Sequence, residues 1–361
     1  MKKLSIFSLL LTTLLLSYSC TGEEQPSVTR PGGGANSGGN TDWLIPQNNV
    51  LDGGPGKDGI PALDAPDFIT VGEVDFLDDD DLVIGFKVGN DIRAYPHPIL
   101  DWHEIINDEI GDIRVAITYC PLTGTGIGWD RDLPSGTTTF GVSGLLYNTN
   151  LIPYDRGTDS NWSQMLLESV QGSMAGTAIE THQVVETSWG TWKKLYPQSQ
   201  VVSTNTGWSR NYDRYPYGDY RTNNNSLFFP VSVNDTRLPA KERVLGIVTE
   251  MKAAKAYRFN SFPTTGLGLR KDVFAGNNLI LIGSQEFNFL QAYVQPDGLD
   301  FEAVQNELPV VMQDNEGNRW NLFGEAVAGP RAGQKLQETR SFIGYWVAWG
   351  AFYQGLEIYG Q

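Results

Sequence analysis

The sequence contains few cysteines, few histidines and few basic residues. Its 361 residues include two Cys, three His, and 26 Lys and Arg against 42 Asp and Glu, for a formal net charge of −16. Three histidines are too few for a His-rich metal site, and no ligand spacing supports a mixed His, Cys and Asp site. The negative charge argues against nucleic acid as a partner, because nucleic acid requires a basic surface.

Residues 1–20 are typical of a secretory signal that ends in a lipoprotein cleavage site. Two lysines precede an apolar stretch at residues 4–16, which is too short to span a bilayer and is followed directly by polar residues. Small serines precede Cys20, so we expect cleavage before Cys20 and its modification by lipid. The alternative is ordinary cleavage nearby, with Cys20 left unmodified.

Residues 21–42 are rich in Gly, Ser and Pro, a composition typical of a flexible tether. We expect a folded domain over residues 43–361, anchored to a membrane through lipid at the cell envelope. The expected location is that of an outer-membrane lipoprotein, periplasmic or surface-exposed. If Cys20 carries lipid, Cys120 has no partner for an intrachain disulfide, and the core must be large enough to be stable without one.

The hydrophobic pattern predicts a mainly β fold with a few short helices, a β-rich α+β protein. Short β-branched and aromatic runs bounded by turn residues occur at residues 82–88, 92–95, 115–120, 137–142, 244–248, 279–282 and 308–312. The turn at residues 314–317 predicts a hairpin. Helical patterns are few, and the best cover residues 98–106 and 163–174.

An internal duplication is a further hypothesis, with β units at about residues 70–170 and 240–352. The Val-Ile-Gly-Phe run at Val83 leads to Arg-Ala-Tyr, and the Val-Leu-Gly-Ile run at Val244 leads to Lys-Ala-Tyr. Further along, Trp129 and Trp162 have Trp320 and Trp346 as apparent counterparts. The alternative is chance similarity among short β motifs.

Six motifs together resemble one family. They are RAYP at residues 93–96, ILDWHEIIND at 99–108, TYCPLTG at 118–124, DRGTDSNWSQ at 155–164, YPYGDY at 215–220 and KERVLG at 241–246. The combination is similar to the DUF3179 family of uncharacterised bacterial and archaeal proteins, from about residue 60 onward. In that family the cysteine motif often carries a second Cys, where this chain has Thr123. The resemblance implies a family but no activity, and Thr123 weakens any role that needs two thiols.

Cys120 and His103 are the candidate catalytic residues. Cys120 ends a predicted strand, where side chains often line a cleft, and it is a candidate nucleophile or soft metal ligand. His103 lies on a predicted helix, one turn before Asn107, and is a candidate base or co-ligand. The alternatives are a buried Cys120 that packs as a small apolar group and a His103 that ties the helix to the sheet. His97, between two prolines, is expected at the surface.

The leading functional hypothesis is a cell-envelope lipoprotein that binds a small molecule, glycan or peptide in a cleft near Cys120. The candidate ligand-binding residues are Tyr119, Asp130, Asp155, Arg156, Trp162, Gln164 and Tyr217. The alternatives are an extracytoplasmic enzyme that uses Cys120 with His103, and a structural or assembly component of the envelope. The sequence identifies neither a metal nor a cofactor.

Overall fold

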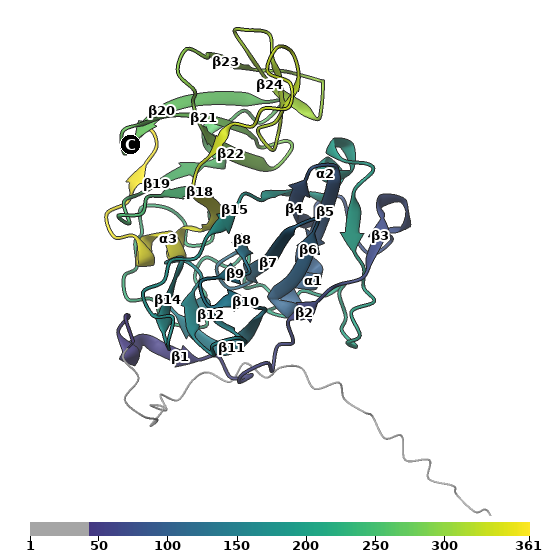
Figure 1. Ribbon diagram of the computed structural model, residues 1–361. Coiled ribbons are helices and arrows are strands. Elements are labelled where there is room, and N and C mark those ends of the chain that lie inside the picture. Colours follow the sequence, from purple (N-terminus) through teal and green to yellow (C-terminus); the bar gives the residue numbers. More distant parts are fainter. Residues whose placement is uncertain (1–42) are drawn as a thin grey trace, which may run out of the picture.

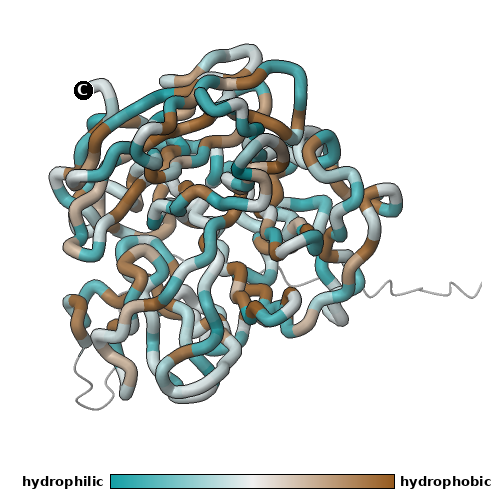
Figure 2. The backbone as a smooth tube through the Cα atoms, turned by 45° about the horizontal axis from the view of Figure 1, so that its top comes forward, coloured by the Kyte–Doolittle hydropathy of each residue, from teal (hydrophilic) through white to brown (hydrophobic). Residues whose placement is uncertain are grey.

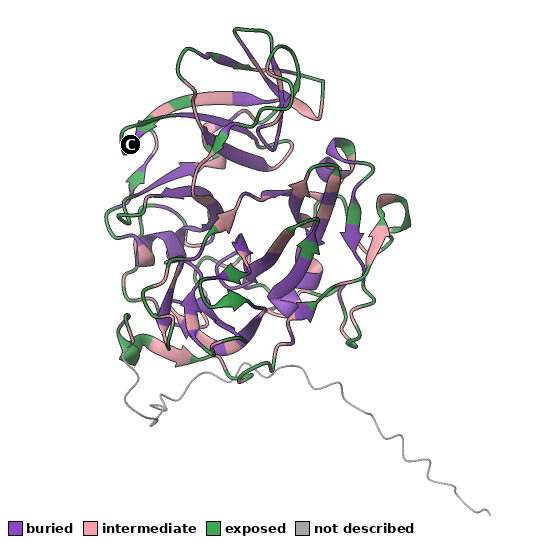
Figure 3. Cartoon of the chain, in the orientation of Figure 1, coloured by how far each residue is buried: buried purple, intermediate pink, exposed green. Residues whose placement is uncertain are grey.

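The computed structural model describes residues 43–361, so the expected signal, Cys20 and the tether lie outside the described residues. Strands dominate, with three short α-helices in the described part of the chain, and the prediction of a mainly β fold is confirmed (Figure 1). The strands are largely buried (Figure 3), and hydrophobic segments alternate with hydrophilic loops along the chain (Figure 2).

The first half of the chain forms three main sheets. One has the order β16 (Val185–Ser188), β4 (Leu82–Val88), β5 (Asp91–Pro96), β17 (Gln200–Val202) and β3 (Phe68–Thr70). The second has the order β15 (Thr181–His182), β8 (Thr125–Asp130), β7 (Ile113–Cys120), β6 (Ile105–Ile110) and β2 (Leu63–Asp64). The third has the order β1 (Val50–Asp52), β11 (Phe140–Tyr147), β12 (Asn150–Asp155), β13 (Asn161–Ser163) and β14 (Glu168–Gln171). The short strands β9 (Asp132–Leu133) and β10 (Gly136–Thr137) pair separately, α1 (His97–His103) follows β5, and α2 (Trp189–Leu195) follows β16.

The second half forms three four-stranded sheets. They have the orders β28 (Ser341–Tyr345), β18 (Arg243–Val248), β19 (Ala254–Arg258), β29 (Glu357–Ile358); β20 (Gly268–Phe274), β21 (Asn277–Ser284), β22 (Phe289–Val294), β27 (Gln337–Glu338); and β23 (Phe301–Ala303), β24 (Val310–Asp314), β25 (Arg319–Asn321), β26 (Ala326–Ala328). The helix α3 (Trp346–Phe352) follows β28. Three 3-10 turns complete the elements at Gln47–Asn49, Val71–Glu73 and Phe259–Ser261.

The two halves repeat one strand order. The run β16-β4-β5-β17 matches β28-β18-β19-β29, with antiparallel pairing throughout except for a parallel last strand in each. Likewise β6-β7-β8-β15 matches β20-β21-β22-β27, and β11-β12-β13-β14 matches β23-β24-β25-β26. The contacts between the halves correspond too, since β28 lies beside β8 and β16 lies beside β22. The corresponding strands of the first half lie between β4 and β17, and those of the second half lie between β18 and β29. Superposition of the two halves would test the duplication hypothesis.

The same contact between a strand glycine and a helix tryptophan packs a helix against a strand in each half. A Cβ at Gly85 would lie 2.0 Å from the Trp192 ring, and a Cβ at Gly246 would lie 2.2 Å from the Trp349 ring. Only a glycine lets each tryptophan lie flat against the strand. Because α2 and α3 each carry such a tryptophan, the partner of Trp346 by strand order is Trp189, not Trp162.

A buried tryptophan also bonds to an aspartate in each half. Trp162 Nε1 donates to Asp155 Oδ2 at 2.9 Å, and Trp320 Nε1 donates to Asp314 Oδ2 at 2.9 Å. Trp320 therefore matches Trp162 rather than Trp129. The motif comparison misaligned these positions because it kept the order of the motifs without knowing how many strands separate them.

Only one of the two predicted helices is present in the structure. Residues 97–103 form α1, which ends where Glu104 adopts a φ of 58°, so Asn107 lies in β6 and not one helical turn after His103. The helix predicted at residues 163–174 is wrong, because a single turn there leads into β14 after Leu167 adopts a φ of 57°. The hairpin predicted at residues 314–317 is confirmed by the pairing of β24 with β25.

A segment without helices or strands joins the two halves and covers the interior. This cover segment, residues 203–242, runs from the end of β17 to the start of β18. Its Tyr215 hydroxyl donates to the carbonyl of Pro121, next to Cys120, at 3.4 Å, and its Ser232 amide donates to Asn148 Oδ1 at 2.7 Å. Connections of this length inside a compact domain are uncommon, and many act as functional lids.

Candidate functional site

Cys120 ends β7 beneath the cover segment. Its side chain is 1% exposed, and Sγ lies 3.8 Å from the carbonyl oxygen of Thr149. Burial, with a smaller contribution from the charge of Glu104, raises the pKa of Cys120 to about 11, and hydrogen bonds from Thr123 oppose the shift. The side chain is therefore a thiol at neutral pH in this closed structure.

Thr123 stands where the family motif often has its second cysteine. Its hydroxyl accepts hydrogen bonds from Thr125 Oγ1 at 3.0 Å and from Asn150 Nδ2 at 2.9 Å. The position is thus part of a buried polar network that holds the turn after β7, and a second thiol is absent from it.

Five polar residues surround Cys120 and with it form what we call the Cys120 cluster. They are Glu104, Thr149, Tyr217, Tyr220 and Lys241. Burial raises the pKa of Glu104 to about 8, and a side-chain hydrogen bond from Tyr217 opposes that shift. The cover segment supplies Tyr217, Tyr220 and Lys241, so three of the five residues come from this segment.

Lys241 is the most unusual member of the cluster. It is 7% exposed, and its Nζ lies 3.1 Å from the centre of the Tyr220 ring without a hydrogen-bond partner. Burial lowers the pKa of Lys241 to about 7, and Cys120 is the acidic group whose charge opposes this. The hydroxyls of Tyr220 and Thr149 are likewise buried, and a side-chain hydrogen bond from Thr149 opposes the raised pKa of Tyr220. A buried polar atom left unpaired is costly, so the unpaired Nζ of Lys241 is the exceptional feature of this cluster.

His103 has both ring nitrogens engaged elsewhere. Nδ1 lies 2.7 Å from the carbonyl oxygen of Pro61, and Nε2 lies 2.7 Å from the hydroxyl of Tyr212. Burial lowers the pKa of His103 to about 4, so the ring is neutral at pH 7. These contacts match the structural alternative considered for His103, and neither involves Cys120.

Three of the candidate ligand-binding residues lie deep in the core. Asp155 and Trp162 bond to each other, and Gln164 Nε2 donates to Thr118 Oγ1 at 3.0 Å; all three are fully buried. Their polar atoms satisfy one another and the neighbouring strands. Such contacts hold the fold together.

The other candidates are spread over the molecule. Tyr119 is buried against His97, with ring centres 4.3 Å apart, and His97 itself is buried rather than at the surface, because its ring faces Glu186 at 3.5 Å. Asp130 pairs with His182 at 3.6 Å, and Arg156 pairs with Asp58 and Asp64 at the surface. Of the candidate set, only Tyr217 joins Cys120 in its cluster.

A cavity of about 330 Å³ opens beside the cluster, and we call it the acidic cavity. Its lining is Asp75, Phe76, Leu77, Asp78, Asp81, Pro98, Asp101, Tyr212, Asp213, Tyr215 and Arg221. Five aspartates thus face one arginine. The floor is Asp101, which is 2% exposed; Oδ2 accepts from Arg221 Nη2 at 2.9 Å, whereas Oδ1 has no hydrogen-bond partner.

Burial raises the pKa of Asp101 to about 7, although Arg221 opposes the shift. The charge of Asp101 in turn helps to raise the pKa of Glu104 in the Cys120 cluster. The acidic cavity and the Cys120 cluster are therefore electrostatically coupled, through the two acids at the end of α1.

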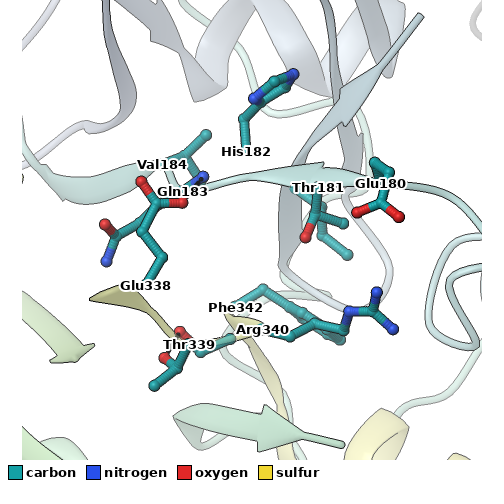
Figure 4. A pocket seen from close by; sticks show the side chains of 11 residues that line it. Glu180, Thr181, His182, Gln183, Val184, Glu338, Thr339, Arg340 and Phe342 are labelled. Carbon is teal, nitrogen blue, oxygen red and sulfur yellow. Dashed lines mark hydrogen bonds between the residues drawn. The ribbon is translucent and has the colours of Figure 1, made fainter. Parts of the chain in front are cut away.

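A second, smaller cavity of about 170 Å³ lies between the halves. Figure 4 shows His182 and Gln183 on one side of it and Glu338, Thr339 and Arg340 on the other. The backbone N–H of Gln183 donates to Glu338 Oε2 at 3.2 Å across the gap. Burial lowers the pKa of His182, and Asp130 opposes the shift.

Sequence reasoning did not single out Asp101, Glu104 or Lys241 as candidates. All three lie inside motifs quoted for the family resemblance, at residues 99–108 and 241–246. Within residues 43–361, no three His, Cys, Asp or Glu side chains are grouped to hold a metal ion. No helix in the same range has the length and apolar character to cross a membrane.

The fold and the site define a β-rich protein of two like halves, with an ionisable interior closed by the cover segment. The chain belongs to the DUF3179 family, described as "Protein of unknown function (DUF3179)", whose family model matches residues 57–355. Comparison with the curated proteins and with the solved structures produced no match.

Proposed function

We propose that this protein binds a small organic cation, an amine or a guanidinium compound, in the acidic cavity. The volume of about 330 Å³ is that of a small-molecule site. Its charge favours a cation, because five aspartates line it against Arg221. The Tyr215 ring is already covered by Arg221, whose guanidinium carbon lies 3.5 Å from the ring centre, so Tyr212 is the tyrosine ring left in the lining for a bound cation.

The observation that carries this proposal is the unpartnered Oδ1 of Asp101. A buried carboxylate oxygen requires a hydrogen-bond donor, and Arg221 is already committed to Oδ2. An ammonium or guanidinium group would supply the donor together with the opposite charge. It would also lower the raised pKa of Asp101, so binding near pH 7 would release protons.

Isothermal titration calorimetry with putrescine, arginine and acetate tests the proposal. We expect putrescine or arginine to bind at pH 7 and acetate not to bind. Asp101→Asn should weaken cation binding at least tenfold, since a hydrogen bond to a charged group contributes roughly 1.5–3 kcal/mol. The matched control is Asp297→Asn, at an exposed aspartate outside the cavity. Unchanged affinity in Asp101→Asn, or no binding of either cation, would contradict the proposal.

We also propose that binding takes place at the cell envelope, with the protein held by lipid on Cys20. The support is the sequence of residues 1–42 alone. Mass spectrometry of the mature protein should find a diacylglycerol-modified Cys20 at the N-terminus, and Cys20→Ala should release the protein from the membrane fraction. An unmodified cysteine in membrane-extracted protein would refute the anchor.

A further inference from the structure

We propose that the acidic cavity is a site for a linear aliphatic diamine or polyamine, with one ammonium group on Asp101 and a second on the aspartates at the cavity rim. This inference rests on the proposed binding of an organic cation. It adds the number of positive charges that the ligand carries and the place where each of them binds.

The floor of the cavity leaves one acceptor open. Asp101 is buried, and Arg221 Nη2 already donates to its Oδ2 at 2.9 Å, so Oδ1 is the oxygen without a hydrogen-bond partner. The first ammonium group of the ligand would donate to this oxygen. Since a water molecule in the liquid occupies roughly 30 Å³, one ammonium group would fill only a small part of the cavity of about 330 Å³.

Three further aspartates of the lining are exposed and form the rim of the cavity. These rim aspartates are Asp75, Asp78 and Asp213. Among the residues that the structure describes, their carboxylates have no ion pair and no hydrogen bond. Asp81, the fifth acid, is half-buried and accepts from the backbone N–H of Asp78 at 2.9 Å. Because Arg221 can offset only one of the five carboxylates, a single ammonium group would leave the cavity negatively charged.

The five carboxylates are spread out rather than gathered around one point. They come from three segments, namely the loop before β4, the helix α1 and the cover segment. In the described part of the chain, no three His, Cys, Asp or Glu side chains are grouped to hold a metal ion. A compact ion would therefore reach only part of this charge. Two ammonium groups joined by a flexible chain would reach the floor and the rim together.

Apolar side chains in the same lining suit the chain that joins two ammonium groups. Phe76, Leu77 and Pro98 line the cavity among the acids, and each of them is half-buried. The methylene groups of a diamine would cover this apolar surface, which a hydrated inorganic cation would leave in contact with water. The lining thus combines an acidic floor, apolar walls and an acidic rim, as an aliphatic diamine requires.

The test compares three ligands that share a four-carbon chain with one ammonium group and differ at the far end. Putrescine carries a second ammonium group there, butylamine a methyl group and 4-aminobutyrate a carboxylate. By isothermal titration calorimetry at pH 7 in low salt, putrescine should bind roughly threefold or more tightly than butylamine, because exposed charge pairs contribute modestly. The compound 4-aminobutyrate should bind most weakly. Added salt should reduce the preference for putrescine, because it screens the exposed rim.

Two variants locate the two ammonium groups. In Asp78→Asn/Asp213→Asn the affinity ratio of putrescine to butylamine should fall below about twofold, because the rim has lost two of its three charges. Asp101→Asn should weaken putrescine and butylamine by a similar factor, since both place an ammonium group on the floor. The exposed Asp297→Asn lies outside the cavity and should keep the wild-type ratio.

The outcomes separate this inference from the proposed function. Equal affinities for putrescine and butylamine would overturn the inference and leave the binding of a single cation standing. A preference for putrescine that persists in Asp78→Asn/Asp213→Asn, with the variant folded by circular dichroism, would also overturn it. If neither amine bound, the proposed function and the inference would both be refuted.

Discussion

Replacing Lys241 with methionine should make the protein more stable, which is unusual for a substitution at a buried residue. The two side chains have similar volumes, and a methionine sulfur packs well on the Tyr220 ring. Lowering the pKa of Lys241 from 10.5 to about 7 corresponds to about 5 kcal/mol at most. Because a real interior relaxes around the charge, we expect Lys241→Met to gain roughly 2–4 kcal/mol at pH 6.

The pH dependence of this gain in stability follows from the lowered pKa of Lys241. Between about pH 7 and pH 10.5 the unfolded chain holds a proton on Lys241 that the folded protein has lost. The cost of burying Lys241 is therefore fully present below pH 7, and it declines as the pH rises toward 10.5. The stability advantage of Lys241→Met should shrink accordingly.

Urea unfolding of wild type, Lys241→Met and the exposed control Lys194→Met at pH 6 and pH 9.5 measures these differences. The advantage of Lys241→Met should be at least 1 kcal/mol smaller at pH 9.5, and Lys194→Met should differ little from wild type at either pH. A wild type that is the more stable protein at pH 6, or an advantage equal at both pH values, would show that Lys241 is not buried as an uncompensated cation.

Two further substitutions test the glycine–tryptophan and aspartate–tryptophan contacts that the halves share. Gly246→Ala should lower the free energy of unfolding by roughly 1–3 kcal/mol, measured by urea unfolding, because its Cβ would lie 2.2 Å from the Trp349 ring. The control is Gly72→Ala, which has open space around it and should change the free energy of unfolding little. Asp155→Asn should cost roughly 2–4 kcal/mol, because the buried carboxylate accepts bonds from Trp162 Nε1 and from Thr158; a change below 0.5 kcal/mol would refute its role as a structural acceptor.

The fold class was predictable because strands with alternating or continuous apolar residues carry a local pattern. The run at residues 82–88 and the turn at residues 314–317 each specify their structure over a few neighbouring positions. The segment at residues 163–174 failed for the converse reason. Its apolar residues are spaced like a helix, but the pairing of β13 with β14 and the packing of both strands override that local preference.

Of the candidate site, only Cys120 and Tyr217 were predicted from the sequence, Cys120 because a chemically distinctive residue at a strand end can be recognised from the sequence alone. Lys241 is 121 positions away, near the end of the cover segment. Its importance comes from having no partner once buried, and burial is a property of the folded chain. His103 drew attention for its chemistry, yet the carbonyl of Pro61 and the hydroxyl of Tyr212 that occupy it could not be inferred from spacing.

The matching strand orders also identify one position at which the two halves differ. Cys120 ends the eight-residue strand β7, and four residues separate it from β8. Ser284 ends the eight-residue strand β21, and four residues likewise separate it from β22. Ser284 Oγ donates to the carbonyl of Gly266 at 2.7 Å, so its side chain is satisfied. The glycine–tryptophan and aspartate–tryptophan contacts recur in both halves, whereas the buried thiol of Cys120 has the hydrogen-bonded hydroxyl of Ser284 as its counterpart. The shared contacts therefore maintain the fold of both halves, and the two matching strand ends differ in the side chain that they bury.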